Sequence, residues 1–262
     1  MKALIVAAGR GRRLGPETDE IPKCMVRVGG RPILHRQVEA LRGAGADELV
    51  IVRGYLGERI AAPDGLAPRF VENPEWAQNN ILASLMYAEA ELASGSGFLF
   101  SYSDIVFAHE HARRVAAAPG AVALVIDRRW RDAYEGRQLH PVSEAELARV
   151  EDGPDGPRVT RVGKTLVAAD EAAGEFLGLA KFSPAGAAAL REVWHEALRV
   201  EGGLDKPFGN ARTLRNAYLS DALNAIAARG VPLVPVFVDG RWREIDTEED
   251  LARAHALVDT WG

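Results

Sequence analysis

The sequence predicts an α/β fold: a Rossmann-like, mixed and mostly parallel sheet, flanked by helices, with a small β-rich insertion. First, strand-length apolar runs alternate with helix-length segments near the N-terminus, as is typical of parallel strands joined by right-handed crossovers. These runs are residues 3–8, 48–52 and 69–73. Second, residues 148–162 form a hairpin pattern around the turn 152–157. We therefore expect one domain over residues 1–262, with the insertion at roughly 128–182.

Composition and charge exclude several classes of protein. The 262 residues carry a formal net charge of −5 without a long basic run, so nucleic acid is not expected as a partner. The single cysteine, Cys24, excludes a disulfide framework or a cysteine metal cluster, and we expect it to be a packed residue. No apolar run reaches 18 residues, and Arg10, Arg12 and Arg13 interrupt the apolar start. We therefore expect no membrane partner, no signal peptide and a cytoplasmic location.

The first element, a buried strand over residues 3–8, runs directly into a loop rich in glycine and arginine. Gly9 and Gly11 free the backbone to approach a ligand, neighbouring arginines supply positive charge, and a segment bounded by prolines then brings in Lys23. This pattern predicts a cradle for a polyphosphate; the alternative is an ordinary turn with solvated arginines. Leu14 stands where a dinucleotide fingerprint needs a small residue, and no Walker sequence occurs.

The motif A-A-G-x-G-x-R-L, followed closely by P-K, resembles the start of the nucleotidyltransferases that make sugar nucleotides and other NDP-activated compounds. In that family the glycine loop holds the NTP, and the matching arginine and lysine contact its phosphates. The resemblance implies that Arg13 and Lys23 are the catalytic residues. It also implies nucleotide contacts from the loop residues Ala7, Ala8, Gly9 and Gly11.

A second match lies at residues 73–85, where N-P-x-W-x-x-N-N-I-x-x-S-L runs from a loop into a helix expected over 81–93. It narrows the resemblance to the cytidylyltransferases related to the phosphocholine and phosphonate enzymes. The resemblance implies that Asn80 and Ser84 lie near the nucleotide. Because asparagine is also a good helix N-cap, a capping role stays open as the alternative for Asn80.

Three carboxylates indicate a site for Mg²⁺, whose preferred ligands are oxygens. Asp104 follows the buried strand 98–100, and an acid at the carboxyl end of such a strand faces the crevice where α/β sheets bind ligands. Glu244 and Asp246 alternate on an extended stretch, so both face one side. The resemblance, which includes W-x-E-I-D-T-x-x-D-L, implies metal binding by Asp104 and Asp246. For Asp104 the alternative is a cap on the helix 109–117.

An arginine-rich stretch with interleaved aromatic residues follows the apolar strand 121–127. Arginine forks bind phosphate or phosphonate groups, and aromatic rings suit the walls of a small pocket. In the resembling family this loop closes over the acceptor substrate; the alternative is a solvated loop with structural ion pairs. Lys181, in the strand 174–183, either enters the site or forms a surface ion pair. The candidate acceptor contacts are Arg129, Tyr134, Arg137, His140 and Lys181.

The remaining elements complete the sheet and its helical layers. The further helices predicted from apolar spacing are 33–44, 184–199, 214–229 and 248–258. Thr247 is the expected N-cap of the last of them. The strand 231–238 contains prolines, which predicts an edge position or a bulge. The polar, glycine-bearing segment 202–213 is either a mobile lid or a contact in a homodimer.

Together these features predict a magnesium-dependent nucleotidyltransferase. The resemblance covers nearly the whole chain, and it implies transfer of CMP from CTP to a small phosphate or phosphonate monoester, with release of pyrophosphate. Two alternatives remain: another NTP with a sugar 1-phosphate, or a non-catalytic nucleotide-binding subunit. Because the loop after Asp127 offers more arginine than aromatic surface, an anionic or neutral polar acceptor is favoured over a quaternary amine.

Overall fold

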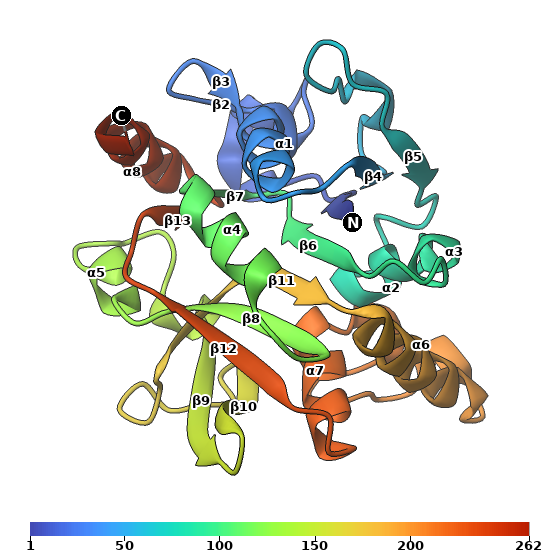
Figure 1. Cartoon of the computed structure of the whole chain (residues 1–262). Helices are drawn as coiled ribbons and strands as arrows, with labels where there is room; N and C mark the ends of the chain where they lie inside the picture. Colours follow the sequence, from blue (N-terminus) through green and yellow to red (C-terminus); the bar gives the residue numbers. More distant parts are fainter. Residues whose placement is uncertain (262) are drawn as a thin grey trace.

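A nine-stranded mixed sheet forms the centre of the computed structural model, which describes residues 1–261 (Figure 1). Its parallel half, in spatial order, is β6 (Phe98–Tyr102), β1 (Lys2–Ala7), β4 (Glu48–Arg53) and β5 (Arg69–Glu72). β11 (Gly174–Phe182) runs antiparallel to β6 and to β8 (Val122–Asp127), and β12 (Leu233–Val238) pairs parallel with β8. The predicted Rossmann-like mixed sheet flanked by helices is confirmed. Among the described strands β12 pairs only with β8, so its predicted edge position is also confirmed.

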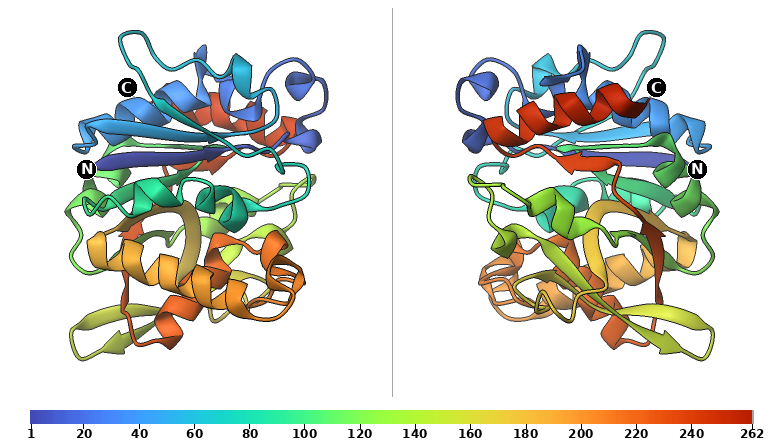
Figure 2. Two further views of the ribbon diagram at one scale, coloured as in Figure 1. Left: turned by 90° about the vertical axis from the view of Figure 1, so that its right-hand side faces the viewer. Right: turned by 90° about the vertical axis from the view of Figure 1, so that its left-hand side faces the viewer.

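The segment predicted as a β-rich insertion, residues 128–182, adds a hairpin to the beginning of β11. Its strands are β9 (Glu146–Gly153) and β10 (Gly156–Lys164), and β9 pairs antiparallel with the first residues of β11. The segment also contains α5 (Trp130–Tyr134). In both views of Figure 2 the hairpin lies at the opposite end of the molecule from β4 and β5. The hairpin is therefore an extension of the main sheet, and the single-domain boundary at 1–262 stays a prediction.

Helices cover both faces of the sheet because side chains of successive strand residues alternate between them. α1 (Ile33–Gly43) and α4 (His109–Ala117) share one apolar core with Ile5 of β1. Leu4 and Val6 point into the other core, beside the helices of the opposite layer. Those helices are α2 (Ile81–Met86), α3 (Glu89–Leu92), α6 (Pro184–Arg199) and α7 (Leu219–Ala228). This sandwich leaves the carboxyl ends of β1 and β6 free to carry loops with polar side chains.

The C-terminal segment returns to those strand ends. β13 (Trp242–Glu244) pairs antiparallel with β7 (Ile105–Phe107), and α8 (Glu248–Val258) follows it. Ile245, which is fully buried, packs with Leu14 and Val26 in a third apolar cluster. β2 (Arg27–Val28) and β3 (Arg31–Pro32) form a small separate ribbon. The short 3₁₀ helices are Arg12–Thr18, Lys23–Met25, Gly57–Arg59, Val142–Glu144, Gly203–Asp205, Leu214–Asn216 and Asp259–Trp261.

Two predicted helices differ from the structure. The helix expected over 81–93 is divided into α2 and α3, because tight hydrogen bonds from the Tyr87 and Ala88 N–H groups to residues three positions earlier replace the α-helical pattern. The helix expected over 214–229 begins as a 3₁₀ turn, and α7 starts only at Leu219. No helix within residues 1–261 is long and apolar enough to cross a membrane. The lid or homodimer role of 202–213 stays a prediction.

Candidate active site

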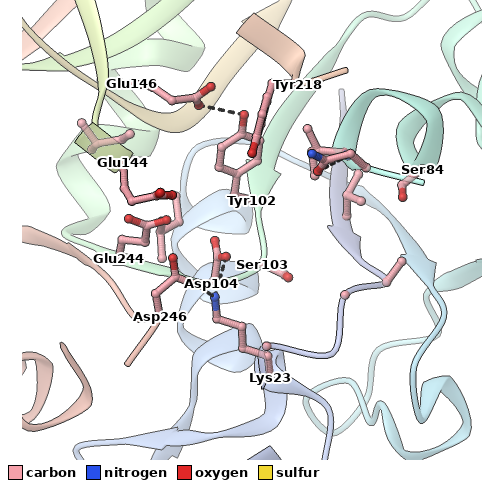
Figure 3. A pocket seen from close by; sticks show the side chains of 18 of the residues that line it. Lys23, Ser84, Tyr102, Ser103, Asp104, Glu144, Glu146, Tyr218, Glu244 and Asp246 are labelled. Carbon is pink, nitrogen blue, oxygen red and sulfur yellow. Dashed lines mark hydrogen bonds and ion pairs between the residues drawn. The ribbon is translucent and has the colours of Figure 1, made fainter. Parts of the chain in front are cut away.

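A cavity of about 400 Å³ opens at the carboxyl ends of β1 and β6 (Figure 3). The two strands are parallel neighbours, so the loop after Ala7 and the turn after Tyr102 leave the sheet at the same edge. Lys23, Asp104, Glu244 and Asp246 gather at one end of this cavity. This is the place where the sequence predicted a ligand-binding crevice.

The loop after β1 is shaped to bring Lys23 into the cavity. Gly11 adopts a left-handed backbone conformation with φ of 69°. A Cβ atom at this position would lie 2.8 Å from Cδ of Lys23, so only glycine leaves room for the lysine side chain. The hydroxyl of Thr18 donates a hydrogen bond of 3.1 Å to the Gly11 carbonyl and closes the loop. Of the predicted loop contacts, Ala8, Gly9 and Gly11 line the cavity, whereas Ala7 belongs to the apolar core.

Lys23 joins two carboxylates that are far apart in the sequence. Its ammonium donates a hydrogen bond of 2.7 Å to Asp104 Oδ2 and a second, shorter one to Asp246 Oδ1. Arg13 contacts the other oxygen of Asp246, with Nη2 and Oδ2 2.5 Å apart. Burial opposes the charged form of Lys23, but the two carboxylates outweigh it and raise the pKa of the amine. Burial opposes ionisation of Asp246 as well, yet Lys23 and Arg13 hold the pKa of Asp246 well below its usual range.

The ends of β7 and β13 explain why Asp104 and Asp246 meet. The antiparallel pairing places Glu244 opposite Ile105, and the Ile245 N–H donates a 2.8 Å hydrogen bond to the Asp104 carbonyl. Glu244 and Asp246 both line the cavity, as their alternation predicted. Burial, together with the charges of Asp246 and Asp104, raises the pKa of Glu244 well above its usual range. The three predicted metal-ligating carboxylates therefore lie at one place.

The donor set is suitable for a hard divalent cation. Oδ1 of Asp104 is buried and has no hydrogen-bond partner within the described chain. An uncompensated carboxylate oxygen at a cavity, next to Asp246 and Glu244, is the type of ligand that Mg²⁺ takes. Asp104 and Asp246 share the Lys23 ammonium as their counter-ion. These residues could hold a cation; its identity as Mg²⁺ stays a prediction.

His140 lies against the same carboxylates, and with Glu244 and Asp246 it forms a group that could hold a metal ion. Its Nε2 is 3.4 Å from Glu244 Oε2, and its Nδ1 is 3.7 Å from Asp246 Oδ2. Arg137 has only donors, and its Nη2 lies 2.9 Å from Nδ1 of His140. Nε2 has no hydrogen-bond partner within residues 1–261, and Nδ1 also lies 3.4 Å from Asp250 Oδ2. The buried His140 ring therefore lies next to Glu244 and Asp246 but does not line the cavity.

Comparison with known proteins identifies the family. A family model described as a MobA-like NTP transferase domain matches residues 3–199. The chain belongs to this family. It is a nucleotidyltransferase, so the resemblance inferred from the glycine loop is confirmed.

Relatives and solved structures agree over most of the chain. The CTP:phosphoglutamine cytidylyltransferase of Campylobacter jejuni is 28% identical over 96% of this chain and 98% of its own length. The 2-aminoethylphosphonate cytidylyltransferase of Lancefieldella rimae is 30% identical over 76% of this chain and 74% of its own length. The solved CTP:phosphocholine cytidylyltransferase of Streptococcus pneumoniae is 22% identical, covers 98% of both chains and superposes with a TM-score of 0.72, which supports the fold.

Asn80 and Ser84 lie where the nucleotide was predicted. Both line the cavity. Asn80 also caps α2, because its Oδ1 accepts a 2.8 Å hydrogen bond from the Ile81 N–H. Ser84 donates to Asn79 Oδ1 at 3.1 Å and accepts from Asn73 Nδ2 at 2.8 Å. Capping by Asn80 is therefore confirmed, and nucleotide contact by Asn80 and Ser84 stays a prediction.

None of the predicted acceptor contacts lines the cavity, and their contact with an acceptor stays a prediction. Arg129 is exposed and pairs with Asp132 at 2.5 Å. Lys181 donates to the Ala118 carbonyl at the end of α4, and Arg137 forms a buried ion pair of 2.6 Å with Asp250. Each of these cations has a structural partner, in agreement with the alternative of a loop that carries structural ion pairs. The remaining two, Tyr134 and His140, are buried behind the cavity and bond to Glu175 and Arg137.

Sequence reasoning missed several residues that line the side of the cavity away from the glycine loop. Gly178 marks a break in the register of β11, with φ of 80°. A Cβ atom there would lie 2.1 Å from the Tyr102 ring, so the bulge lets this ring stand in the cavity. One signal was available in the sequence, since Glu175 is an acid within a largely apolar strand. The other missed lining residues on this side are Glu144, Glu146, Lys164 and Tyr218.

Proposed function

We propose that the chain transfers CMP from CTP to a small phosphate or phosphonate monoester and releases pyrophosphate. The observation that carries the proposal is the meeting of Lys23 and Arg13 with Asp104 and Asp246 at the end of the glycine loop. The two relatives supply the nucleotide and the class of acceptor for this proposal, since both are named as cytidylyltransferases that act on a phosphate or a phosphonate.

The chemistry needs no nucleophile or base from the protein. An oxygen of the acceptor's phosphate or phosphonate attacks the α-phosphorus of CTP, and the bond between that phosphorus and the oxygen bridging to the β-phosphate breaks. Pyrophosphate leaves with the bond electrons. The attacking oxygen is already ionised at neutral pH, so catalysis consists of positioning and of neutralising the charge that develops.

Each charged residue has a place in this scheme. The backbone at Gly9 and Gly11 follows the triphosphate closely, while Arg13 and Lys23 hold its oxygens and stabilise the departing pyrophosphate. Asp104 and Asp246 are the residues that would hold Mg²⁺, with Glu244 beside them. When bound, Mg²⁺ supplies neutralisation of negative charge on the phosphate oxygens. Because Lys23 shares these two carboxylates in the ligand-free chain, we expect its ammonium to move to the phosphates when nucleotide and cation enter.

Pyrophosphate release tests this function. CTP, UTP, ATP and GTP are each incubated with Mg²⁺ and with phosphoglutamine, 2-aminoethylphosphonate, phosphocholine or glucose 1-phosphate. We expect release with CTP and with at least one of the first three acceptors, and a CMP-linked product in phosphorus NMR. Release restricted to UTP and glucose 1-phosphate, or CTP binding without any release, would overturn the proposal.

Matched variants then link the reaction to the site. Lys23→Ala and Asp104→Asn should each lower kcat by about 100-fold or more, because each removes charge stabilisation next to the reacting phosphates. Lys206→Ala and Asp155→Asn are the controls, since both residues are exposed and lie outside the cavity. Turnover retained in both site variants would contradict the mechanism.

A further inference from the structure

Glu244 differs from the other two carboxylates of the predicted metal site, because no residue within 1–261 donates a hydrogen bond to it. Asp104 and Asp246 both accept from Lys23, whereas the nearest cationic or basic group to Glu244 is the His140 ring. The charge of Lys23 also reaches Glu244, but burial and the two neighbouring carboxylates outweigh it. Glu244 lines the cavity beside Asp246 (Figure 3). A cation is therefore missing next to Glu244.

His140 presents an unpartnered nitrogen to this carboxylate. The ring is buried, and Nε2 has no hydrogen-bond partner within the described chain. Nε2 lies 3.4 Å from Glu244 Oε2. A buried polar atom without a partner is costly, so two such groups facing each other need an explanation. Because Glu244 both contacts Nε2 and lines the cavity, an ion that enters the cavity reaches this nitrogen by coming between the two groups.

The spacing of three side chains is that of ligands around one small cation. One ligand atom from each of His140, Glu244 and Asp246 lies within 4.8 Å of the others. Zn²⁺ binds nitrogen and oxygen at about 2.0–2.2 Å in tetrahedral geometry, which places neighbouring ligand atoms about 3.4 Å apart. The separation of Nε2 and Glu244 Oε2 has this value, 3.4 Å. An ion between them therefore requires movement mainly of Asp246.

We propose that His140 Nε2, Glu244 and Asp246 bind a divalent cation of the Zn²⁺ and Co²⁺ type in preference to Mg²⁺. Imidazole nitrogen is a good ligand for these ions, whereas Mg²⁺ takes oxygen ligands. Two carboxylates balance the double charge, and the fourth ligand position of the ion faces the cavity that Glu244 and Asp246 line. The site goes beyond the proposed function, because it uses neither Asp104 nor Lys23 and needs no nucleotide.

A carboxylate on the far side of the ring orients His140 for this role. Nδ1 lies 3.4 Å from Asp250 Oδ2. With Nε2 on the ion, Nδ1 carries the ring hydrogen and Asp250 accepts it, as is common for histidine ligands of metals. Arg137 then moves away from Nδ1 but keeps its 2.6 Å hydrogen bond to Asp250 Oδ1. Arg13, whose side chain is 47% exposed, gives up Asp246 Oδ2 to the ion.

Metal binding without nucleotide tests the proposal. In calorimetry, the wild type should bind one Zn²⁺ more tightly than Mg²⁺ by about tenfold or more. Co²⁺ at the same site should show the strong visible absorption of tetrahedral geometry. His140→Phe, which keeps an aromatic ring in place, and Glu244→Gln should each weaken Zn²⁺ binding by about tenfold or more, since losing even an outer-shell partner costs about 10–100-fold. His109→Phe, at an exposed position, is the matched control and should bind as the wild type.

Three results would overturn the site. The first is wild-type Zn²⁺ affinity in His140→Phe, and the second is no preference for Zn²⁺ over Mg²⁺. The third is loss of Zn²⁺ binding in Asp104→Asn but not in His140→Phe, because the ion would then lie at the predicted Mg²⁺ site.

X-ray absorption of the wild type loaded with one equivalent of Zn²⁺ covers the case of a variant that does not fold. We expect one imidazole among four ligands at about 2.0 Å, and a spectrum with oxygen ligands only would contradict the role of His140. Neither measurement uses CTP, so failure of the proposed reaction would leave this result unaffected.

Discussion

At the scale of single residues, the ammonium of Lys23 balances the charge of the cavity. It is buried between Asp104 and Asp246, and Arg13 adds a second, half-exposed cation on the outer side of Asp246. A buried ion pair is worth little relative to apolar packing, but breaking one leaves an uncompensated charge. The position of Lys23 is therefore not explained by stability alone; under the proposed function, its ammonium exchanges these carboxylates for phosphate oxygens.

Replacing Lys23 with methionine should separate metal binding from catalysis. Lys23→Met removes the cation that competes for Asp104 and Asp246, so the nucleotide-free protein should bind Mn²⁺ more tightly by about tenfold or more. Electron paramagnetic resonance of free Mn²⁺ measures this affinity, and the same variant should lose pyrophosphate release. Lys206→Met serves as the control. Unchanged or weaker Mn²⁺ binding by Lys23→Met would show that Lys23 and the cation do not share these carboxylates.

At the scale of elements, the first turn of α8 holds two parts of the site together. Asp250 Oδ2 accepts hydrogen bonds from the backbone N–H and hydroxyl of Thr247 and from the Asp246 N–H, which fixes the chain at the metal-site carboxylate. Its Oδ1 accepts from Arg137 on the segment after α5. Glu249 accepts from the N–H groups of Gln138 and Leu139 on that segment. The segment predicted to cover the acceptor is therefore docked onto the helix that positions Asp246.

Asp250→Asn should destabilise the protein in a pH-dependent way. Burial by itself raises the pKa of Asp250, but hydrogen bonding to His140 and the charge of Arg137 outweigh it and lower the pKa to about 2. A depressed pKa contributes stability above the unfolded value of about 3.9, and this stability is lost as the pH falls toward 2. We expect the variant to lose about 3 kcal/mol of unfolding free energy at pH 7 in urea titrations.

The difference between wild type and Asp250→Asn should then shrink between pH 5 and pH 2, provided both proteins remain folded enough to measure. Asp132→Asn, which removes an exposed ion pair with Arg129, should change stability by less than about 1 kcal/mol at every pH. A deficit for Asp250→Asn that is the same at all these pH values would mean that Arg137 and His140 do not stabilise the carboxylate charge.

At the scale of the whole molecule, the parts of the site that could be predicted from the sequence are mainly polar residues that follow the end of a strand. Gly11 and Asp104 could be placed because the carboxyl ends of the parallel strands β1 and β6 meet at one edge of the sheet. Lys23 and Asp246 were placed through the family resemblance. The residues on the side of the cavity away from the glycine loop could not be predicted in this way. It depends on the bulge at Gly178, which is a consequence of tertiary packing against Tyr102.

The type of a residue also does not tell which way its side chain points. Arg129 and Lys181 have the right charge for a phosphonate, yet each points to a partner outside the cavity. Glu146 is an example of the opposite kind, because its sequence position did not suggest a site residue. It lies in a strand of the hairpin and reaches the cavity only because β9 pairs with the beginning of β11. A motif such as the glycine loop lies within one short stretch of sequence and can be recognised there. A pocket assembled from several strands depends instead on how those strands pack.

Because the cavity draws on segments from Val6 to Asp246, nucleotide binding should stabilise the entire fold. A ligand that binds only the folded chain adds RT ln(1 + [L]/Kd), which is about 2.7 kcal/mol at 100 times Kd. CTP with Mg²⁺ should therefore raise the urea midpoint of the wild type more than equal concentrations of UTP, ATP or GTP. Arg13→Ala should reduce this shift, because Arg13 lines the cavity and is the residue proposed to hold the triphosphate. Equal shifts with all four nucleotides would mean that the cavity around Asn80 and Ser84 does not select the base.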